Sequence, residues 1–227
     1  GESSLYGDFF GLDDLFTEKP EVQDGLIQVF KDMVTDYDID GFRIDTVKHV
    51  NDEFWHAFGP ELEAHAAGLG KTDFFMFGEV FDSNPAATSR FTTELPLDAV
   101  LDFGFQSAAR NFAGQGGPTD NLAGFFASDD YYTDADSNVY ALPTFLGNHD
   151  IGRIGLFLNQ DNPGADDSEL LARDQLAHAL MYFGRGMPVV YYGDEQGFVG
   201  DGGDQDARQD MMPSLVGTYN DDDLIGT

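Results

Sequence analysis

Apolar residues return at helical spacing in three segments of the chain. In the segment 20–37 they recur every three or four positions, at Val22, Leu26, Val29, Phe30, Met33, Val34 and Tyr37. This spacing predicts an amphipathic helix, with Thr17 as a candidate N-cap and a proline in the first turn. The segments 51–67 and 168–183 predict two further helices.

Short apolar runs alternate with these helices and predict strands. They cover residues 42–45, 74–77, 99–103, 141–146 and 188–192. Stretches rich in Gly, Asp and Ser predict loops at 114–119, 129–138 and 200–206. Because helices alternate with strands, we expect a parallel sheet and an α/β fold.

Polar side chains stand at the ends of three predicted strands. This arrangement suits a (β/α)₈ TIM barrel, whose catalytic groups gather at the carboxyl ends of its strands. Five strands correspond to the carboxyl-terminal part of such a barrel, strands 4 to 8. On this interpretation the first three strands are absent from the chain.

Arg43 and Asp45 form the first candidate site. In a strand they point to the same side, about 6 to 7 Å apart along the backbone. The fixed cation would hold Asp45 ionised and oriented. An Arg-x-Asp pair taken alone is more often a structural ion pair, so the assignment needs independent support.

Two further strand ends supply that support. Glu79 lies among phenylalanines in Phe-Gly-Glu-Val-Phe, where partial desolvation should raise its pKa toward that of a general acid. The apolar run before His149 and Asp150 leads directly into polar residues, as at a substrate-facing strand end. Glycosidic cleavage needs a carboxylate nucleophile and a carboxylic acid, and Asp45 and Glu79 can fill these roles.

The segments 41–49, 77–81 and 145–150 resemble, in order, the second, third and fourth signature regions of glycoside hydrolase family 13, the α-amylase family. The segments 12–15 and 188–195 resemble the motif at the edge of the family's inserted second domain and its eighth strand. The family's first signature, an Asp and an Asn-His pair, is absent. The resemblance implies that residues 1–17 end the inserted domain and that 18–227 hold strands 4 to 8.

The resemblance also implies roles for individual residues. Asp45 would be the nucleophile, Glu79 the general acid and base, and Asp150 a stabiliser that binds sugar hydroxyls. The implied substrate-binding residues are Arg43, Lys48, His49 and His149. The pair Lys48 and His49 resembles that of endo-acting amylases and favours a polymeric α-glucan.

A calcium ion is the cofactor that the resemblance implies. Its ligands in this chain would be the Asp14 carboxylate and the main-chain oxygen of His49, which are hard oxygen donors. Asp14 has an alternative interpretation as one more solvated acid. Binding by these residues alone would be weak.

The charge balance excludes some partners. The chain has 42 acidic and 11 basic residues and a formal charge of −31, which opposes binding to nucleic acid or anionic membranes. Adaptation to high salt and solubility explain the acidity equally well. Without cysteine there is no disulfide framework, and the chain shows no apolar run that spans a membrane and no signal peptide. We expect a monomeric, secreted parent enzyme.

Alternatives remain open at this point. Within the family, the chain could act on α-1,6 bonds or transfer glycosyl groups. Outside it, Asp45, Glu79 and Asp150 could bind Mg²⁺ with Lys48 as base, although Arg43 and His149 would oppose the metal charge. A non-catalytic relative that only binds carbohydrate is a further alternative.

The aromatic residues suggest two different roles. Trp55 falls on the apolar stripe of a predicted helix, which favours a core position. Tyr131, Tyr132 and Tyr191 lie in or near loops and are the better candidates for sugar stacking.

Overall fold

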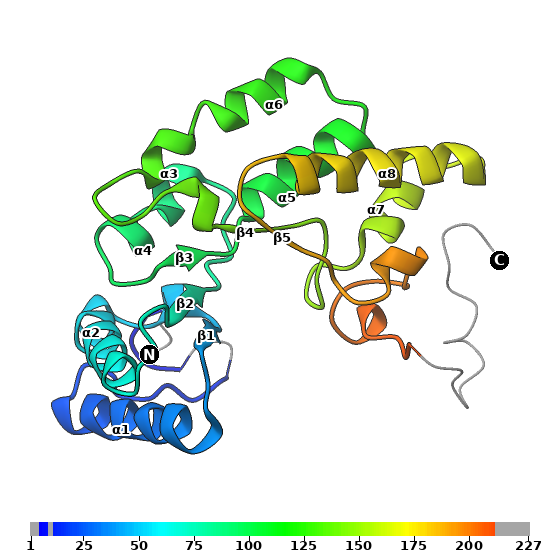
Figure 1. Cartoon of the computed structure of the whole chain (residues 1–227). Helices are drawn as coiled ribbons and strands as arrows, with labels where there is room; N and C mark the ends of the chain where they lie inside the picture. Colours follow the sequence, from blue (N-terminus) through cyan, green and yellow to red (C-terminus); the bar gives the residue numbers. More distant parts are fainter. Residues whose placement is uncertain (1–4, 9–10, 212–227) are drawn as a thin grey trace. The chain divides into compact units, whose positions relative to one another are not determined.

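A computed structural model describes residues 5–8 and 11–211. It divides into two compact units, which are described separately (Figure 1). Among the described residues, unit 1 comprises 5–8, 11–101 and 131–138, and unit 2 comprises 102–130 and 139–211. The division at residue 17, between an inserted domain and the barrel, stays a prediction.

Unit 1 contains a three-stranded parallel sheet in the order β1-β2-β3. Its strands are β1 (Gly41–Ile44), β2 (Phe75–Gly78) and β3 (Ala99–Val100). Its helices are α1 (Pro20–Tyr37), η1 (Val47–His49), α2 (Asp52–Gly68), α3 (Pro85–Thr88) and α4 (Arg90–Thr93). A 3₁₀ turn, η3 (Asp129–Tyr132), crosses the boundary between the units.

The helices α1 and α2 lie side by side (Figure 1), and aromatic rings join α1 to both α2 and β1. The Phe30 ring lies 5.4 Å from the rings of both Phe42 and Phe58, edge to face. Trp55 is 2% exposed, which confirms its predicted place in the core. The predicted stripe of α1 is therefore only partly its packing surface, because Val34 is buried whereas Val29 and Tyr37 are exposed.

Unit 2 contains a parallel pair of strands, β4 (Pro143–Phe145) and β5 (Met187–Val189). Its helices are α5 (Phe103–Ala109), the π-helix η2 (Arg110–Gly114), α6 (Thr119–Phe126), α7 (Ile154–Asp161) and α8 (Asp167–Phe183). Short 3₁₀ turns are η4 (Val139–Ala141), η5 (Asp194–Gln196) and η6 (Asp204–Ala207). Its buried core joins α5, α7 and α8, through Phe105, Leu158 and Met181 among others.

All five predicted strands and all three predicted helices occur; β1 and β2 are shifted by one residue, and β3, β4 and β5 are shorter than expected. Thr17 as the cap of α1 was wrong, because Lys19 occupies the N-cap without a side-chain bond. The Thr17 hydroxyl instead donates to Asn51 at 2.6 Å, in a buried position. The predicted loops at 129–138 and 200–206 contain 3₁₀ turns, and the helices between 85 and 161 were not predicted.

Candidate active site

One candidate region lies at the carboxyl ends of β1 and β2 in unit 1. Ile44 and Gly78 are paired in the register of the two strands, so Asp45 and Glu79 occupy equivalent positions one residue beyond them. The backbone N–H of Glu79 donates to the Ile44 carbonyl at 2.7 Å, and that of Val47 donates to the Glu79 carbonyl at 3.0 Å. These bonds hold the two carboxylate-bearing loops together.

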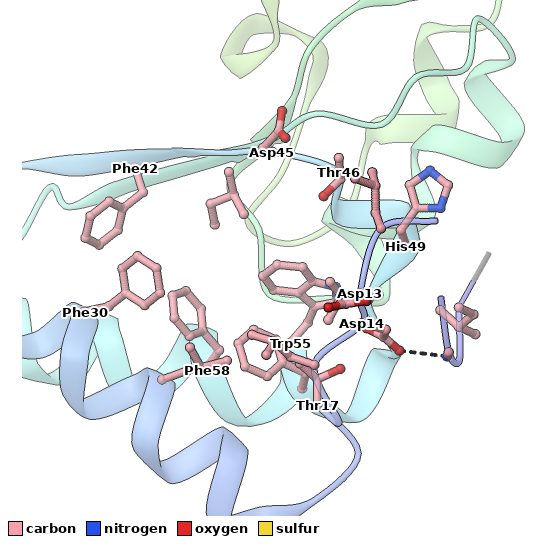
Figure 2. Close-up of a pocket in the computed structure, with 18 of the residues that line it drawn as sticks. Asp13, Asp14, Thr17, Phe30, Phe42, Asp45, Thr46, His49, Trp55 and Phe58 are labelled. Atoms are coloured by element: carbon pink, nitrogen blue, oxygen red, sulfur yellow. Dashed lines mark hydrogen bonds between the residues drawn. The ribbon is translucent and has the colours of Figure 1, made fainter. Parts of the chain in front are cut away.

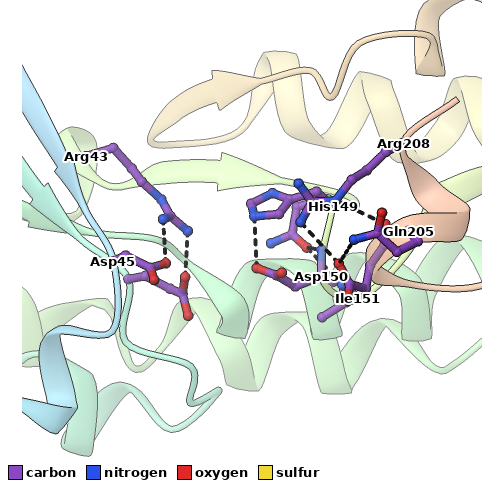
Figure 3. A network of polar contacts seen from close by, with 10 residues as sticks. Arg43, Asp45, His149, Asp150, Ile151, Gln205 and Arg208 are labelled. Atoms are coloured by element: carbon purple, nitrogen blue, oxygen red, sulfur yellow. Dashed lines mark hydrogen bonds and ion pairs between the residues drawn. The ribbon is translucent and has the colours of Figure 1, made fainter. Parts of the chain in front are cut away.

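The Arg43 guanidinium bonds both carboxylates. Its Nη1 donates to Asp45 Oδ1 at 2.6 Å (Figure 3), and its Nη2 donates to Glu79 Oε2 at 2.5 Å. The predicted Arg43–Asp45 pair is thus confirmed, whereas the bond to Glu79 was not foreseen. The Asp45 side chain is 64% exposed and that of Glu79 is 11% exposed. The predicted role of Glu79 as a general acid stays a prediction.

Gly78 is required where Val47 packs over the end of β2. A Cβ at this position would lie 2.7 Å from Val47 Cγ2 and 3.0 Å from Leu97 Cδ1. The absent side chain therefore lets η1 approach β2 directly before Glu79. Trp55 donates from its indole nitrogen to the Val47 carbonyl at 3.3 Å, which anchors the same turn.

Lys48 links the loops that follow β1 and β2. Its Nζ donates to the Phe81 carbonyl at 2.7 Å and lies 5.8 Å from the centre of the Phe81 ring. The structure thus places Lys48 near both predicted catalytic strand ends, although its amine already has a protein acceptor. Its predicted contact with substrate stays a prediction.

A cavity of about 770 Å³ lies beside Asp45 in unit 1. Figure 2 shows aromatic rings, including those of Phe30, Phe42 and Phe58, on one side of it and polar groups on the other. The predicted calcium residues Asp14 and His49 both line it. Asp14 Oδ2 accepts from the Gly7 N–H at 2.8 Å (Figure 2).

These residues do not complete a calcium site. Calcium takes six to eight oxygen ligands. Residues 5–8 and 11–211 contain no group of three or more His, Cys, Asp or Glu side chains that could hold a metal ion. The Asp14 carboxylate and the main-chain oxygen of His49 could supply only part of such a ligand shell.

A second candidate region, in unit 2, is the turn after β4. Asn148 and Gly152 close it with backbone bonds of 3.0 and 3.1 Å in both directions. The Asn148 side-chain oxygen accepts from the N–H groups of Asp150 and Ile151, both at 2.9 Å. His149 Nε2 lies 3.2 Å from Asp150 Oδ2 (Figure 3). The turn thus brings the predicted pair together.

Three buried polar residues next to this turn were missed from the sequence. Arg153, Asp194 and Gln209 are all buried and bond one another through the Arg153 side chain. Asp194 lies within the segment 188–195, and Arg153 lies three residues beyond the segment 145–150, and these positions were the available signal. Their mutual contact joins residues far apart in the chain and has no local pattern.

The stacking predictions for tyrosine had different outcomes. Tyr132 is buried, and its hydroxyl bonds that of Thr88 at 2.5 Å, so a role in sugar stacking was wrong. Tyr131 is exposed. Burial, together with a side-chain hydrogen bond with Tyr192, raises the pKa of the Tyr191 hydroxyl to about 12.

The chain is similar to known proteins. The family profile described as alpha amylase, catalytic domain, matches residues 1–223. This chain belongs to the alpha-amylase family. It is 56% identical to an alpha-amylase of Streptomyces lividans over 227 residues, which are all of this chain and 25% of that protein. It is 29% identical to a cyclomaltodextrinase of Thermoanaerobacter pseudethanolicus, over 87% of this chain and 31% of that protein.

A solved family structure has the same fold. The crystal structure of an alpha-amylase from Geobacillus thermoleovorans, complexed with acarbose, matches with a TM-score of 0.77 and 30% identity. The match covers 92% of this chain and 44% of that chain. The predicted (β/α)₈ barrel class is therefore confirmed, and the chain spans less than half of each of these three relatives.

Proposed function

We propose that the protein containing this chain is a retaining glycoside hydrolase that cleaves α-1,4 links within starch-like α-glucans. One observation carries the proposal. In a member of the alpha-amylase family, a single guanidinium binds two carboxylates at the ends of neighbouring parallel strands, at 2.6 and 2.5 Å. Two carboxyl groups close together are what double displacement at a sugar requires.

Asp45 is proposed as the nucleophile and Glu79 as the acid and base. The exposed Asp45 carboxylate attacks the anomeric carbon while Glu79 gives its proton to the leaving glycosidic oxygen, and a covalent glycosyl-enzyme forms. Water then attacks that carbon, loses a proton to Glu79 and displaces Asp45. Two inversions leave the product in the α configuration.

Arg43 has two functions in this scheme. It keeps Asp45 ionised, as a nucleophile must be. Glu79 must carry a proton before it acts as an acid, and a neutral carboxyl group is a weaker acceptor for the guanidinium than a carboxylate. Protonation of Glu79 would therefore loosen its bond to Arg43 and free it for the substrate.

Asp150 and His149 are proposed to bind hydroxyl groups of the sugar that is cleaved, and Lys48 and His49 to bind glucose units beyond the cut. The hydroxyl groups of a sugar are neutral and are therefore not repelled by the chain, which carries a formal charge of −31. This charge also supports the absence of nucleic acid and membrane partners. No helix among residues 5–8 and 11–211 is long and apolar enough to cross a membrane.

The full-length protein acting on maltoheptaose, followed by proton NMR, provides the test. We expect the α-anomer to appear first, and first release of the β-anomer would contradict the proposal. Parallel assays on pullulan and cyclodextrin decide between α-1,4, α-1,6 and cyclic substrates, the last suggested by the cyclomaltodextrinase relative. New longer products would indicate transfer. Activity that survives EDTA without Mg²⁺ would exclude the magnesium alternative.

Calcium, secretion and a monomeric state are proposed from the family. Asp14 and His49 would supply part of a calcium site, and both line the same cavity. Calcium titration of the full-length protein and of Asp14→Asn by calorimetry tests the ligand assignment, with weaker binding expected in the variant. Assay of culture supernatant and sedimentation velocity test the other two expectations.

A further inference from the structure

A fully buried arginine stands three residues beyond Asp150 in unit 2. The Arg153 side chain has 0% exposure, and its Nη1 donates to Asp194 Oδ1 at 2.7 Å and to the Tyr192 carbonyl at 2.6 Å. Its Nε donates to Gln209 Oε1 at 2.7 Å. The side chain therefore joins the turn after β4 to the segments that contain Tyr192 to Asp194 and Gln209.

Aromatic rings surround the same guanidinium. The centres of the Tyr191, Tyr192 and Phe198 rings lie 4.4, 5.0 and 5.3 Å from Arg153 Cζ. Rings at these distances stabilise a cation and restrict its orientation. Arg153 is thus held in one position by charge, by hydrogen bonds and by stacking.

The turn that carries Asp150 has almost no space around its backbone. A Cβ on Gly203 would lie 2.3 Å from the Asp150 carbonyl oxygen, and one on Gly152 would lie 3.1 Å from the Gly202 carbonyl oxygen. Gly152 also has φ +103°, a conformation that favours glycine. The segment 200–209 therefore packs directly against the turn, and Arg153 bonds Gln209 within that segment.

We infer that Arg153 is a positioning residue for Asp150, acting through Asp194 and Gln209. The guanidinium anchors one end of the turn, and the segment 200–209 that it holds covers the other side. The Asp150 carboxylate itself depends on backbone bonds and on His149 for its orientation. The inference rests on the proposed function, because it assumes that Asp150 acts on the sugar.

A second buried arginine in unit 2 provides a matched control. Arg185 bonds the buried Asp102 and also Asp129, and the Phe125 ring lies 5.0 Å from its Cζ. Like Arg153, Arg185 pairs with a buried aspartate and lies against an aromatic ring. It differs in position, because Arg185 lies before β5 and Asp102 lies before α5. Arg153→Lys and Arg185→Lys should both lower the melting temperature of the full-length protein, and only the first should impair Asp150.

The experiment measures kcat and KM for maltoheptaose well below the melting temperatures of both variants. We expect Arg153→Lys to lower kcat about 10²-fold, as misplacement of a reacting group does. Arg185→Lys should stay within about 3-fold of the wild type, since its partners Asp102 and Asp129 belong neither to the turn nor to the segment 200–209. Equal losses in the two variants would overturn the inference. If Arg153→Lys does not fold, Gln209→Leu removes one contact and should lower kcat about 10-fold.

The pH profile provides a readout that a purely structural role would not change. Burial raises the pKa of Asp194 to about 6, and the charged groups facing it are Arg153, His178 and Asp174. A neutral Asp194 holds the guanidinium less firmly. The ratio of kcat between wild type and Asp194→Asn should therefore be largest at pH 7 and fall toward unity below pH 6. A constant ratio would count against positioning through Asp194.

The inference and the proposed function fail in different ways. If Asp45→Asn abolishes activity while Arg153→Lys matches Arg185→Lys, only the positioning role is wrong. If Asp45→Asn retains wild-type activity, the proposed function is wrong, and the positioning role that rests on it is also overturned.

Discussion

The two units hold their carboxylates by different means. In unit 1, Asp45 and Glu79 stand one residue beyond β1 and β2, and the strand register places them next to each other. In unit 2, Asp150 stands on a closed turn five residues beyond the end of β4. Its neighbourhood is held by the buried side chain of Arg153 instead of by paired strands.

This difference indicates which kinds of change each part should tolerate. Parallel strands fix backbone positions by many weak bonds, so a side-chain change in unit 1 should alter chemistry more than geometry. A buried charged network has few members, and loss of one leaves others unpaired. We therefore expect changes in the Arg153 network to affect stability and geometry together.

The largest expected effect is the loss of kcat when a proposed catalytic carboxylate of unit 1 is replaced. Asp45→Asn should lower kcat by about 10⁴-fold or more, because no covalent intermediate can form. Glu79→Gln should lower it about 10²- to 10⁴-fold through loss of the acid and base. Reducing-sugar release from starch by the full-length protein measures both. Asp40→Asn, which changes an exposed partner of Lys71, is the matched control and should leave kcat unchanged.

The next effect concerns the stability of unit 2. Burial raises the pKa of Asp194 from 3.8 to about 6 in the folded state, so folding favours its protonated form. This contribution is present below about pH 4 and is lost as pH rises through about 6. The free energy of unfolding of the wild type, relative to Asp194→Asn, should fall by on the order of 3 kcal/mol from pH 4 to pH 7.

Denaturant unfolding of the full-length protein between pH 4 and 7 provides this measurement. Asp161→Asn is a control whose difference from the wild type should stay nearly constant over this range, because the hydrogen bond from Arg110 lowers the pKa of Asp161. The contribution of Asp161 is present above pH 3.8 and is lost as pH falls through its lowered pKa. A pH-independent difference for Asp194→Asn would contradict the assigned shift.

A smaller effect sharpens the role of the shared guanidinium. Arg43→Lys keeps the charge but cannot bond both carboxylates with the same planar geometry. We expect kcat to fall roughly 30- to 100-fold, with the melting temperature little changed. Arg90→Lys, on a partly exposed pair with Asp52, controls for the substitution itself. Wild-type kcat in Arg43→Lys would show that charge alone is sufficient.

The smallest effect concerns Lys48. Lys48→Met removes one hydrogen bond to the Phe81 carbonyl and a positive charge near the strand ends. Loss of about 1 kcal/mol corresponds to roughly a fivefold decrease in kcat/KM for maltoheptaose. Lys71→Met, which removes ion pairs with Asp38 and Asp40, should have no such effect. Equal kcat/KM in both variants would remove Lys48 from the substrate-binding residues.

Local patterns in the sequence predicted the elements and some pairs. Helical spacing identified α1, α2 and α8, because an apolar stripe must face a core. Strand alternation placed Arg43 beside Asp45, two residues apart, and the structure confirms the bond at 2.6 Å. The short distance between His149 and Asp150 likewise follows from their adjacency.

Contacts between distant segments were decided by the tertiary structure alone. Arg43 meets Glu79 because β1 and β2 pair in one register, and a shift of register would separate them. Arg153 meets Asp194 and Gln209, 41 and 56 residues away, when three loops close over one guanidinium. Thr17 was a candidate helix cap and Tyr132 lay in a predicted loop, but the side chains of both are buried. Local spacing therefore determined which residues stand at the strand ends of this protein. Packing decided which of them bond the same guanidinium, since burial and distance depend on the whole fold.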